Sequence, residues 1–331
     1  MKPIFNNVLI ICPGGATTAG PEAIHQLCAD LNRLGAKSSI AYFPFSKKHE
    51  TPKAYQKYNV PIRLYEDKSG DLIIFPEIIT TYALKVKNAK AAIWWMSVNN
   101  FTCERYGNPI RDKLRYFKNL LKGLRPIGGI SSLKRVLHFS QSYYAFNFLK
   151  MNEIESTLLS DPIPFYTEES YLSSLKNILP NNRSNRILFN PNKGAKFNQY
   201  LIDRFKNLEF FPLQGYNRHE LAKLFLDSKL YIDFGHHPGK DRLPREAALH
   251  GCCVITGVHG SAKNALDVNI PDEYKIDINS ENFMQLFETQ VNKIFHCFKE
   301  CSEDFENYRF TISNEQIEFD MQILKNFFRH N

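Results

Sequence analysis

The sequence lacks any hydrophobic run long enough to cross a bilayer, which takes about 18 or more apolar residues in a helix. The apolar stretch around Trp94 and Trp95 is interrupted by Lys90 and Asn99. We expect no secretory leader either, because the first apolar run, residues 8–12, is shorter than the ~7–15 residues of a leader core. The sequence therefore predicts a cytoplasmic protein, with attachment to the cytoplasmic face of the inner membrane left open.

Patterns for disulfides and metals are missing as well. The chain has seven cysteines, an odd number, and no two of them form a Cys-x-x-Cys pair. This pattern argues against a disulfide framework and a structural zinc site. No Asp-x-Asp motif is present to bind a divalent cation, so we expect no metal site.

The composition of the 331 residues is that of an ordinary globular protein, with 43% hydrophobic and 23% charged residues. At about 150 residues per domain, this length suggests two domains. The 42 basic residues exceed the 34 acidic ones, which gives a formal net charge of +8. Such an excess suits a phosphate-bearing ligand, an anionic membrane or a nucleic acid, and it does not choose among them.

Short apolar runs alternate with helical patterns through both halves of the chain. The runs predict strands at residues 8–12, 38–43, 71–75, 90–96, 136–139, 186–189, 208–211, 230–234 and 252–256. Helical spacing predicts helices at residues 21–34, 142–152, 199–206, 220–226, 245–250, 280–298 and 316–328. Apolar strands between helices are typical of parallel sheets covered on both faces. We therefore predict an α/β fold of two Rossmann-like, doubly wound parallel-sheet domains that face a cleft.

The stretch from Ser160 to Asn185 differs from its surroundings because it is rich in proline, asparagine and serine. We place the domain boundary there, with an N-terminal domain of residues 1–165 and a C-terminal domain of residues 166–331. Whether the terminal helix packs back on the N-terminal domain is left open. Ligands of such sheets bind beyond the carboxyl ends of the strands, so the loops that follow the strands are the candidate sites.

A glycine-rich turn follows the first predicted strand. Glycines there let the backbone approach a ligand, and the N-terminus of the next helix favours an anion. The turn lacks the Gly-x-Gly-x-x-Gly fingerprint of dinucleotide sites, and no Walker lysine follows it. A plain strand-to-helix turn is the alternative. The residues expected to contact a ligand here are Gly14, Gly15, Thr17, Thr18, Gly20 and His25.

A denser signal follows the strand at residues 230–234, where histidines, glycines and cations precede a helix. The helix is expected to start near Leu243 or Pro244. Lys240 and Arg242 lie just ahead of that start, where two cations and free backbone amides suit a diphosphate. Glu246, expected in the first helical turn, suits ribose hydroxyls. Lys193 follows another strand and is expected to point to the same region. A charged surface loop is the alternative.

This second half resembles the C-terminal domain of GT-B glycosyltransferases, in particular the retaining family 4 type of bacterial surface-polysaccharide synthesis, with its Glu–seven residues–Glu pattern. In that family a Pro-x-x-Glu-Ala segment opens a helix that ends in glycine before a short apolar strand. Here Pro244 leads into Glu246 and Gly251 with the same Glu-to-Gly interval. The chain departs from the pattern at Pro238, where the family has its first glutamate.

The resemblance implies a glycosyltransferase without a metal and without a cofactor, in which a nucleotide sugar is the co-substrate. Cations would neutralise the diphosphate, where charge develops as the glycosidic bond breaks. The implied catalytic residues are Lys193, His237 and Arg242. The resemblance implies nucleotide contact by Glu246 and diphosphate contact by Lys193 and Arg242. Together with the loops that follow the strands of this half, the residues predicted to bind the donor are Lys193, Gly194, His236, His237, Gly239, Lys240, Asp241, Arg242, Glu246, Gly260 and Ser261.

The glycine-rich turn would then hold a glycan or a lipid-linked acceptor, in synthesis of the lipopolysaccharide or capsule type. A general base, if the reaction needs one, could be His25, Glu77 or Glu22, and the sequence does not choose among them.

The segment from Ile110 to Arg125 predicts a basic amphipathic helix. Its cations stand at positions 111, 115, 118, 122 and 125, and its apolar residues at 114, 117, 121 and 124. Such a helix can lie on an anionic bilayer or pack its apolar face on the domain, and both interpretations remain open. Contact with an inner-membrane surface through Arg111–Arg125 would suit a lipid-linked acceptor.

Two other functions remain open from the sequence. A nucleotide-sugar epimerase of the same fold would convert the free nucleotide sugar without an acceptor. A non-catalytic protein that binds an anionic membrane or a nucleic acid would use the positive charge alone. Nucleic acid is the least supported partner, because the basic segment has no stacking aromatics beyond Tyr116 and Phe117 and no recognisable binding motif.

Overall fold

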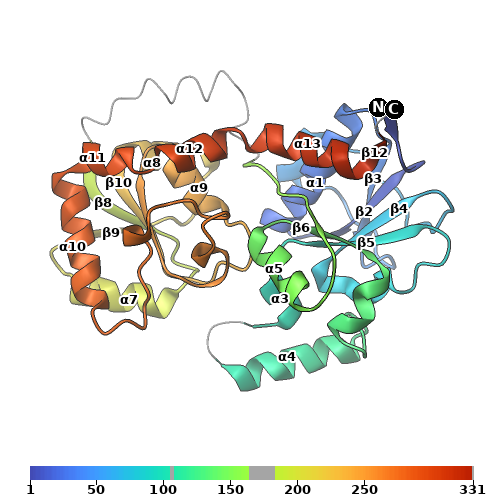
Figure 1. Cartoon of the computed structure of the whole chain (residues 1–331), viewed down its shortest axis with the longest axis horizontal. Coiled ribbons are helices and arrows are strands. Elements are labelled where there is room, and N and C mark those ends of the chain that lie inside the picture. Colours follow the sequence, from blue (N-terminus) through green and yellow to red (C-terminus); the bar gives the residue numbers. More distant parts are fainter. Residues whose placement is uncertain (105–107, 164–182, 330–331) are drawn as a thin grey trace. The chain divides into compact units, whose positions relative to one another are not determined.

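The computed structural model describes residues 1–104, 108–163 and 183–329 (Figure 1). The chain forms two compact units. Unit 1 comprises Met1–Pro164 together with Gln316–Asn331, and unit 2 comprises Phe165–Glu315. The predicted domain boundary between residues 165 and 166 lies outside the described residues.

Unit 1 is built on a six-stranded sheet with the order β3-β2-β4-β5-β6-β7, in which all neighbours are parallel. The strands are β2 (Val8–Pro13), β3 (Ser38–Phe43), β4 (Leu72–Pro76), β5 (Lys90–Trp95), β6 (Leu137–Ser140) and β7 (Thr157–Leu158). Side chains alternate between the two faces of a strand, so Val8 and Ile10 enter one core cluster while Leu9 and Ile11 enter another. The sheet is therefore buried on both faces.

Helices cover both faces of this sheet. On the face of Ile10 lie α1 (Ala19–Arg33) and α13 (Glu315–Phe327), whereas α5 (Tyr143–Met151) lies on the face of Leu9 (Figure 1). The other helices of unit 1 are α2 (Thr80–Ala83), α3 (Val98–Thr102) and α4 (Pro109–Leu121), and its 3₁₀ helices are η1 (Lys53–Tyr58), η2 (Glu77–Ile79) and η3 (Ile130–Arg135).

The end of the chain completes the core of unit 1. Phe319, Ile323 and Phe327 of α13 are at most 1% exposed and join the cluster around Ile10. Beyond α13, the two-residue strands β12 (Phe328–Arg329) and β1 (Lys2–Pro3) pair antiparallel.

Unit 2 has a four-stranded parallel sheet with the order β11-β10-β8-β9. Its strands are β8 (Ser184–Phe189), β9 (Glu209–Pro212), β10 (Ser228–Asp233) and β11 (Cys253–Thr256). Its helices are α7 (Ala195–Arg204), α8 (Arg218–Asp227), α9 (Arg242–Leu249), α10 (Phe283–His296), α11 (Phe298–Glu303) and α12 (Glu306–Ser313), with 3₁₀ helices η4 (Gly260–Lys263) and η5 (Asp272–Tyr274). The parallel sheets and their alternating helices confirm the predicted α/β class.

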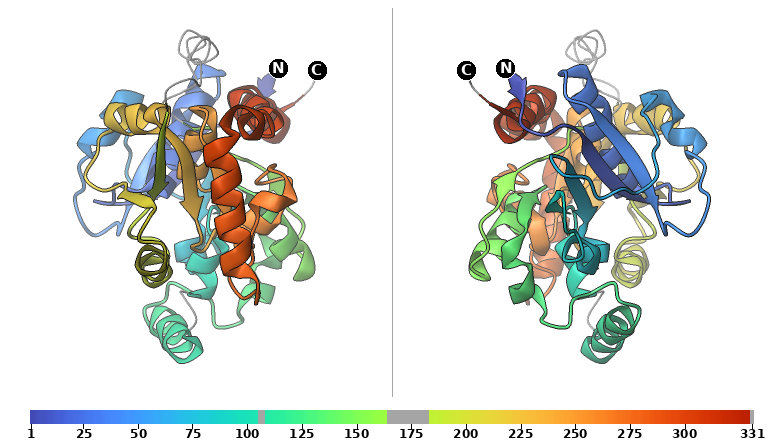
Figure 2. Two further views of the ribbon diagram at one scale, coloured as in Figure 1. Left: turned by 90° about the vertical axis from the view of Figure 1, so that its left-hand side faces the viewer. Right: turned by 90° about the vertical axis from the view of Figure 1, so that its right-hand side faces the viewer.

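Helix α4 is unusual because none of its residues is buried. It projects from the rest of unit 1 in Figure 1 and in both views of Figure 2. The helix is shorter than predicted, since it ends at Leu121 and Gly123 adopts a left-handed φ of 66°. Leu124 therefore packs against the core of unit 1, and Arg125 is only 2% exposed. Neither belongs to the surface of the helix, which corrects the prediction for these two positions.

None of the helices in the described part of the chain combines the length and the hydropathy needed to span a bilayer.

Candidate functional site

The strand order of unit 2 creates a switch point between β8 and β10. After β8 the chain moves outward to β9, and it then returns to add β10 on the other side of β8. The loops after β8 and β10, residues 190–194 and 234–241, therefore leave the same edge of the sheet in opposite directions. Ligands of doubly wound sheets bind at such a point.

Lys193 joins these two loops. Its Nζ lies 2.7 Å from Oδ2 of Asp233, at the end of β10, and 2.7 Å from Oδ2 of Asp241, just before α9. Gly194 follows in the left-handed conformation, with φ 67°, and caps the start of α7. Burial lowers the pKa of Lys193, but the two carboxylates outweigh burial and raise it above its usual value. Lys193 is therefore a fully charged ammonium.

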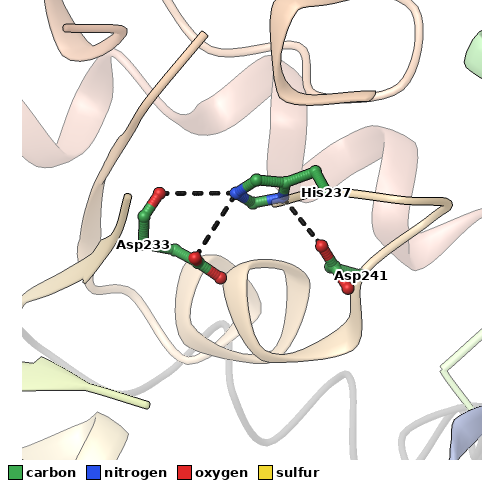
Figure 3. A group of neighbouring side chains, drawn as sticks. All are labelled: Asp233, His237 and Asp241. Carbon is green, nitrogen blue, oxygen red and sulfur yellow. Dashed lines mark hydrogen bonds and ion pairs between the residues drawn. The ribbon is translucent and has the colours of Figure 1, made fainter. Parts of the chain in front are cut away.

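His237 lies between the same two carboxylates (Figure 3). Its Nδ1 is 2.9 Å from Oδ2 of Asp241, and its Nε2 is 3.5 Å from Oδ1 of Asp233. Burial and the Lys193 ammonium lower the pKa of His237, but the two carboxylates outweigh them and raise it to about 9. The imidazole is therefore protonated at neutral pH.

Lys193, His237, Asp233 and Asp241, together the four-charge cluster, carry two positive and two negative charges. Burial raises the pKa of each carboxyl, but the two cations outweigh it and hold both pKa values below their usual range. The side chain of Asp241 is 27% exposed and that of Lys193 14%, whereas His237 is fully buried. Lys193 is thus a paired cation, and His237 has no surface through which to contact a ligand. The structure thus shows how these two residues are paired and buried, while their predicted roles toward a donor stay predictions.

The same cluster contains a donor set of the kind that metals use. Asp233, His237 and Asp241 each offer one ligand atom, and these atoms lie within 4.8 Å of one another. However, the ammonium of Lys193 already bonds both carboxylates, and the imidazole carries a proton. A metal ion would have to displace both, so we assign no metal to these residues.

Lys240 is engaged with a residue far along the chain. Its Nζ lies 3.0 Å from Oε1 of Glu315, and Nη1 of Arg245 lies 2.7 Å from Oε2 of the same carboxylate. The side chains of Arg245 and Glu315 are 1% and 4% exposed. Arg245 also donates to the backbone carbonyls of Lys240 and Asp241. This ion triad therefore fixes the loop that carries the predicted donor residues.

Helix α9 begins at Arg242, one or two residues earlier than predicted. Arg242 is therefore the first residue of the helix, and it is half-buried. The same shift moves Glu246 into the second turn, where it is 6% exposed. The predicted ribose contact assumed a first-turn position, so the structure corrects the placement of Glu246.

The loop after β11 supports the loop after β10. Gly260 has a left-handed φ of 59°, and a side chain there would collide with the carbonyl of His237. The backbone N–H of Ser261 donates to that carbonyl at 2.8 Å, and its Oγ donates to the carbonyl of Gly239 at 2.6 Å. Gly260 and Ser261 were predicted to bind the donor, and in the structure they hold the backbone of its loop.

A pair of histidines lies at this edge of the sheet. The rings of His236, after β10, and His259, after β11, are 5.7 Å apart, and both residues are half-exposed. His236 was among the predicted donor residues, whereas His259 was not, although it lies in the loop that follows a predicted strand.

Unit 1 has a switch point of the same kind, between β2 and β4. Five of the six predicted acceptor residues are exposed or half-exposed there, in the loop after β2 or at the start of α1: Gly14, Gly15, Thr17, Thr18 and Gly20. His49 packs on the first of these glycines, where a side chain would overlap its ring. No sequence motif marked His49.

Glu77 follows β4 at the same edge and is 2% exposed. Its carboxylate accepts the N–H of Met96 at 3.3 Å and the side-chain amide of Asn100 at 3.0 Å. Burial raises the pKa of Glu77. As one of the three candidate general bases, Glu77 is enclosed by protein rather than open to a ligand.

The sixth predicted acceptor residue, His25, is fully buried. Its Nε2 lies 2.9 Å from the hydroxyl of Tyr42, and burial lowers its pKa. Glu22 is 6% exposed and is held by Tyr58 at 3.0 Å and by Lys57 at 3.1 Å. His25 and Glu22 thus pack the base of the loop, and this corrects the prediction of a ligand contact for His25.

No protein-family model and no curated protein sequence matches the chain. Solved structures match its fold over almost its whole length. HepE from Anabaena, solved with UDP-glucose, has a TM-score of 0.61 at 12% identity, and the match covers 96% of this chain and 98% of HepE.

Two further structures give similar matches. Sucrose-phosphate synthase from Thermosynechococcus elongatus has a TM-score of 0.60 at 10% identity, with 97% of this chain and 98% of the synthase covered. WaaG, a glycosyltransferase involved in lipopolysaccharide biosynthesis, has a TM-score of 0.57 at 12% identity, with 95% and 99% covered. These matches confirm the predicted fold class, the GT-B fold with its two Rossmann-like domains.

Proposed function

We propose that the chain is a glycosyltransferase that moves a sugar from a nucleotide-sugar donor to a glycan or lipid-linked acceptor. The observation that carries this proposal is a GT-B fold over the whole chain in which charged side chains gather at the switch point of unit 2. HepE, which has the same fold, was solved with UDP-glucose, and WaaG is a glycosyltransferase.

We assign the donor diphosphate to the carboxyl edge of unit 2. Arg242 opens α9, where its cation and the positive end of the helix dipole suit a phosphate. Lys193 joins it by turning from Asp241 toward a phosphate oxygen. The leaving diphosphate gains negative charge as the glycosidic bond breaks, and these cations stabilise that charge. We propose that they take the place of a metal.

His237 acts in this scheme as a positioning residue. It is protonated and within ion-pair distance of both carboxylates. When Lys193 turns to the phosphate, His237 keeps Asp233 and Asp241 paired. Lys193 can therefore turn away without leaving two buried carboxylates unpaired. Unpaired carboxylates would be destabilising in a low-dielectric site.

The acceptor belongs, in this proposal, at the carboxyl edge of unit 1, beside Gly14 and Gly15. No atom lies within 4 Å of the place where a side chain of Gly15 would begin, so the backbone is open to a sugar there, whereas the ring of His49 covers Gly14. The finer proposal is synthesis of a surface polysaccharide of the lipopolysaccharide or capsule type, on the cytoplasmic face of a membrane. It is supported by the fold shared with WaaG, which is involved in lipopolysaccharide biosynthesis.

The test is a thermal-shift screen of the full chain against UDP, GDP, CMP and ADP and their sugars. A ligand that binds only the folded state raises the melting temperature, so one nucleotide and its sugars should stand out. Arg242→Ala should lower transfer from that donor about a hundredfold, whereas Arg204→Ala, an exposed position on α7, should leave it unchanged.

Stabilisation by none of these ligands would contradict the proposed function. An unchanged transfer rate in Arg242→Ala would remove this residue from the mechanism. Incubation with the donor alone provides the remaining control, because conversion of its sugar without an acceptor would identify an epimerase instead.

A further inference from the structure

Helix α4 presents a continuous apolar stripe to solvent. Ile110, Leu114, Phe117 and Leu121 are 73%, 64%, 55% and 73% exposed. Their spacing of four, three and four residues places them on one face of the helix. This group is the apolar stripe.

A second stripe of cations runs beside the first. Arg111, Arg115, Lys118 and Lys122 each follow an apolar residue by one position, so they repeat its spacing on the adjacent face. All four are exposed. The acidic residue of the helix, Asp112, is half-buried and lies 3.6 Å from Arg115. This group is the cation stripe.

The helix contacts unit 1 through the side that lies opposite the apolar stripe, a mixed side with Asn119 and Tyr116. Asn119 donates to Sγ of Cys103 at 3.3 Å, and the ring of Tyr116 meets Phe101 edge-on at 6.3 Å. An ordinary surface helix buries its apolar face and exposes its polar face. In α4 the most apolar face is instead the exposed one, so unit 1 leaves the apolar stripe uncovered.

We propose that α4 is an interfacial anchor that lies on an anionic lipid bilayer. A helix with an apolar stripe beside a row of Lys and Arg has the two features that such binding uses, apolar burial at the acyl boundary and attraction to anionic headgroups. The charge of the cation stripe favours a bilayer over a second copy of this chain, because two copies packed through α4 would bring eight cations together.

Arg125, at the foot of α4, determines which part of unit 1 meets the bilayer. Its guanidinium donates to the carbonyls of Asn100 at 2.6 Å and Phe101 at 3.1 Å, and also to that of Ile78. These acceptors belong to α3 and η2, which follow β5 and β4 at the carboxyl edge of the sheet. Arg125 is therefore a tether between α4 and this edge.

The glycine-rich loop after β2 opens at the same carboxyl edge. An anchor tethered there holds the loop close to the lipid surface. Resting on the proposed function, we infer that the sugar acceptor is carried by a membrane lipid and is taken directly from the bilayer.

The first experiment is co-sedimentation of the full chain with vesicles of phosphatidylcholine, with or without phosphatidylglycerol. We expect binding to the anionic vesicles, weakened at least tenfold by high salt because headgroup attraction is screened. Leu114→Ser with Phe117→Ser should abolish it. The control is Leu286→Ser with Phe310→Ser, which changes two apolar residues that are 49% and 73% exposed elsewhere, and it should bind as the unaltered protein does.

Equal binding to both vesicle types, or to neither, would overturn the anchor. So would a dimer that the double substitution at Leu114 and Phe117 dissociates in the absence of any vesicle binding, since the stripe would then belong to a second copy. Tight, salt-sensitive binding to an oligonucleotide with no binding to vesicles would assign the cation stripe to nucleic acid.

The acceptor is tested with vesicles of total bacterial polar lipid and a radiolabelled nucleotide sugar chosen from the thermal-shift screen. Label should enter the organic-soluble fraction, at least tenfold more slowly in the double variant, while its thermal shift with the donor stays unchanged. Label only in water-soluble glycan would overturn a lipid-borne acceptor. Vesicle binding without any donor-induced shift would instead contradict the proposed function and leave the anchor standing.

Discussion

At the carboxyl edge of β10, buried charged side chains are stabilised by pairing with groups of opposite charge. His237 has no exposed surface, yet its pKa is raised to about 9 because two carboxylates face it. In an unfolded chain the pKa of a histidine is about 6.5. The difference makes its protonated form part of what holds unit 2 together.

This difference predicts how stability depends on pH. A raised pKa gives stability that is fully present below pH ~6.5 and is lost as the pH rises through about 9, on the order of 3 kcal/mol in all. Urea unfolding at a series of pH values from 6 to 10 measures it. His237→Gln should flatten this dependence, whereas His219→Gln, on the exposed start of α8, should preserve it. An identical pH profile in His237→Gln would contradict a protonated, paired imidazole.

For single residues, the sequence predicted where a side chain lies better than it predicted which side chains it pairs with. Lys193 and Arg242 could be placed near one site because each follows a strand of a parallel sheet. That Lys193 would be neutralised by Asp233 and Asp241 depends on side-chain packing across two loops, which no periodicity records. Asp233 did leave a signal, as the acidic residue within the apolar run of residues 230–234.

At the scale of secondary-structure elements, ion pairs connect the first residue of α13 to α9 and to the loop before it. Glu315 begins α13 and binds both Lys240 and the buried Arg245. Because Arg245 also holds the loop before α9, one carboxylate supports the helix whose N-terminus we assign to the donor.

Loss of the Glu315 charge should therefore be costly. Glu315→Gln leaves the guanidinium of Arg245 buried without its counterion, and breaking such a buried pair typically costs about 3–5 kcal/mol. Thermal unfolding followed by circular dichroism measures the change, with Glu318→Gln, an exposed position one turn further along α13, as the control. Equal melting temperatures for the two variants would show that the ion triad contributes little.

The positions of the predicted strands followed closely from the sequence, because short apolar runs make buried strands, and the structure moves their ends by only one or two residues. The orientation of a helix face did not follow. The periodicity of α4 revealed an apolar stripe, but the same pattern fits a helix that packs inward, and only its contacts through Tyr116 and Asn119 settle the matter. Leu124 and Arg125 matched the pattern yet lie beyond the helix end.

At the scale of the whole molecule, the main feature is the path of the chain between the two units. It builds most of unit 1, then all of unit 2, and returns to unit 1 with α13. The sequence left this return open, since a terminal amphipathic helix suits either domain. The structure resolves it through Phe319, Ile323 and Phe327, which enter the core of unit 1.

A substitution in α13 should consequently weaken strands that lie some three hundred residues away in the sequence. Ile323→Ala removes a fully buried side chain and should cost about 2–5 kcal/mol. Hydrogen exchange should then speed up in β2 and α1 while β10 stays protected. Ile317→Ala, at a position 60% exposed on the same helix, should change neither. Faster exchange confined to unit 2 would contradict the assignment of α13 to unit 1.

The return of α13 also sets an order of completion during synthesis. A ribosome makes residues 1–163 first, then every residue of unit 2, and only afterwards Phe319, Ile323 and Phe327. Unit 2 can therefore finish folding while unit 1 still lacks part of its core. The half of the protein that is begun first is finished last. Until then, the part of its sheet face that α1 leaves uncovered is open apolar surface for a chaperone to cover or for a neighbouring nascent chain to capture.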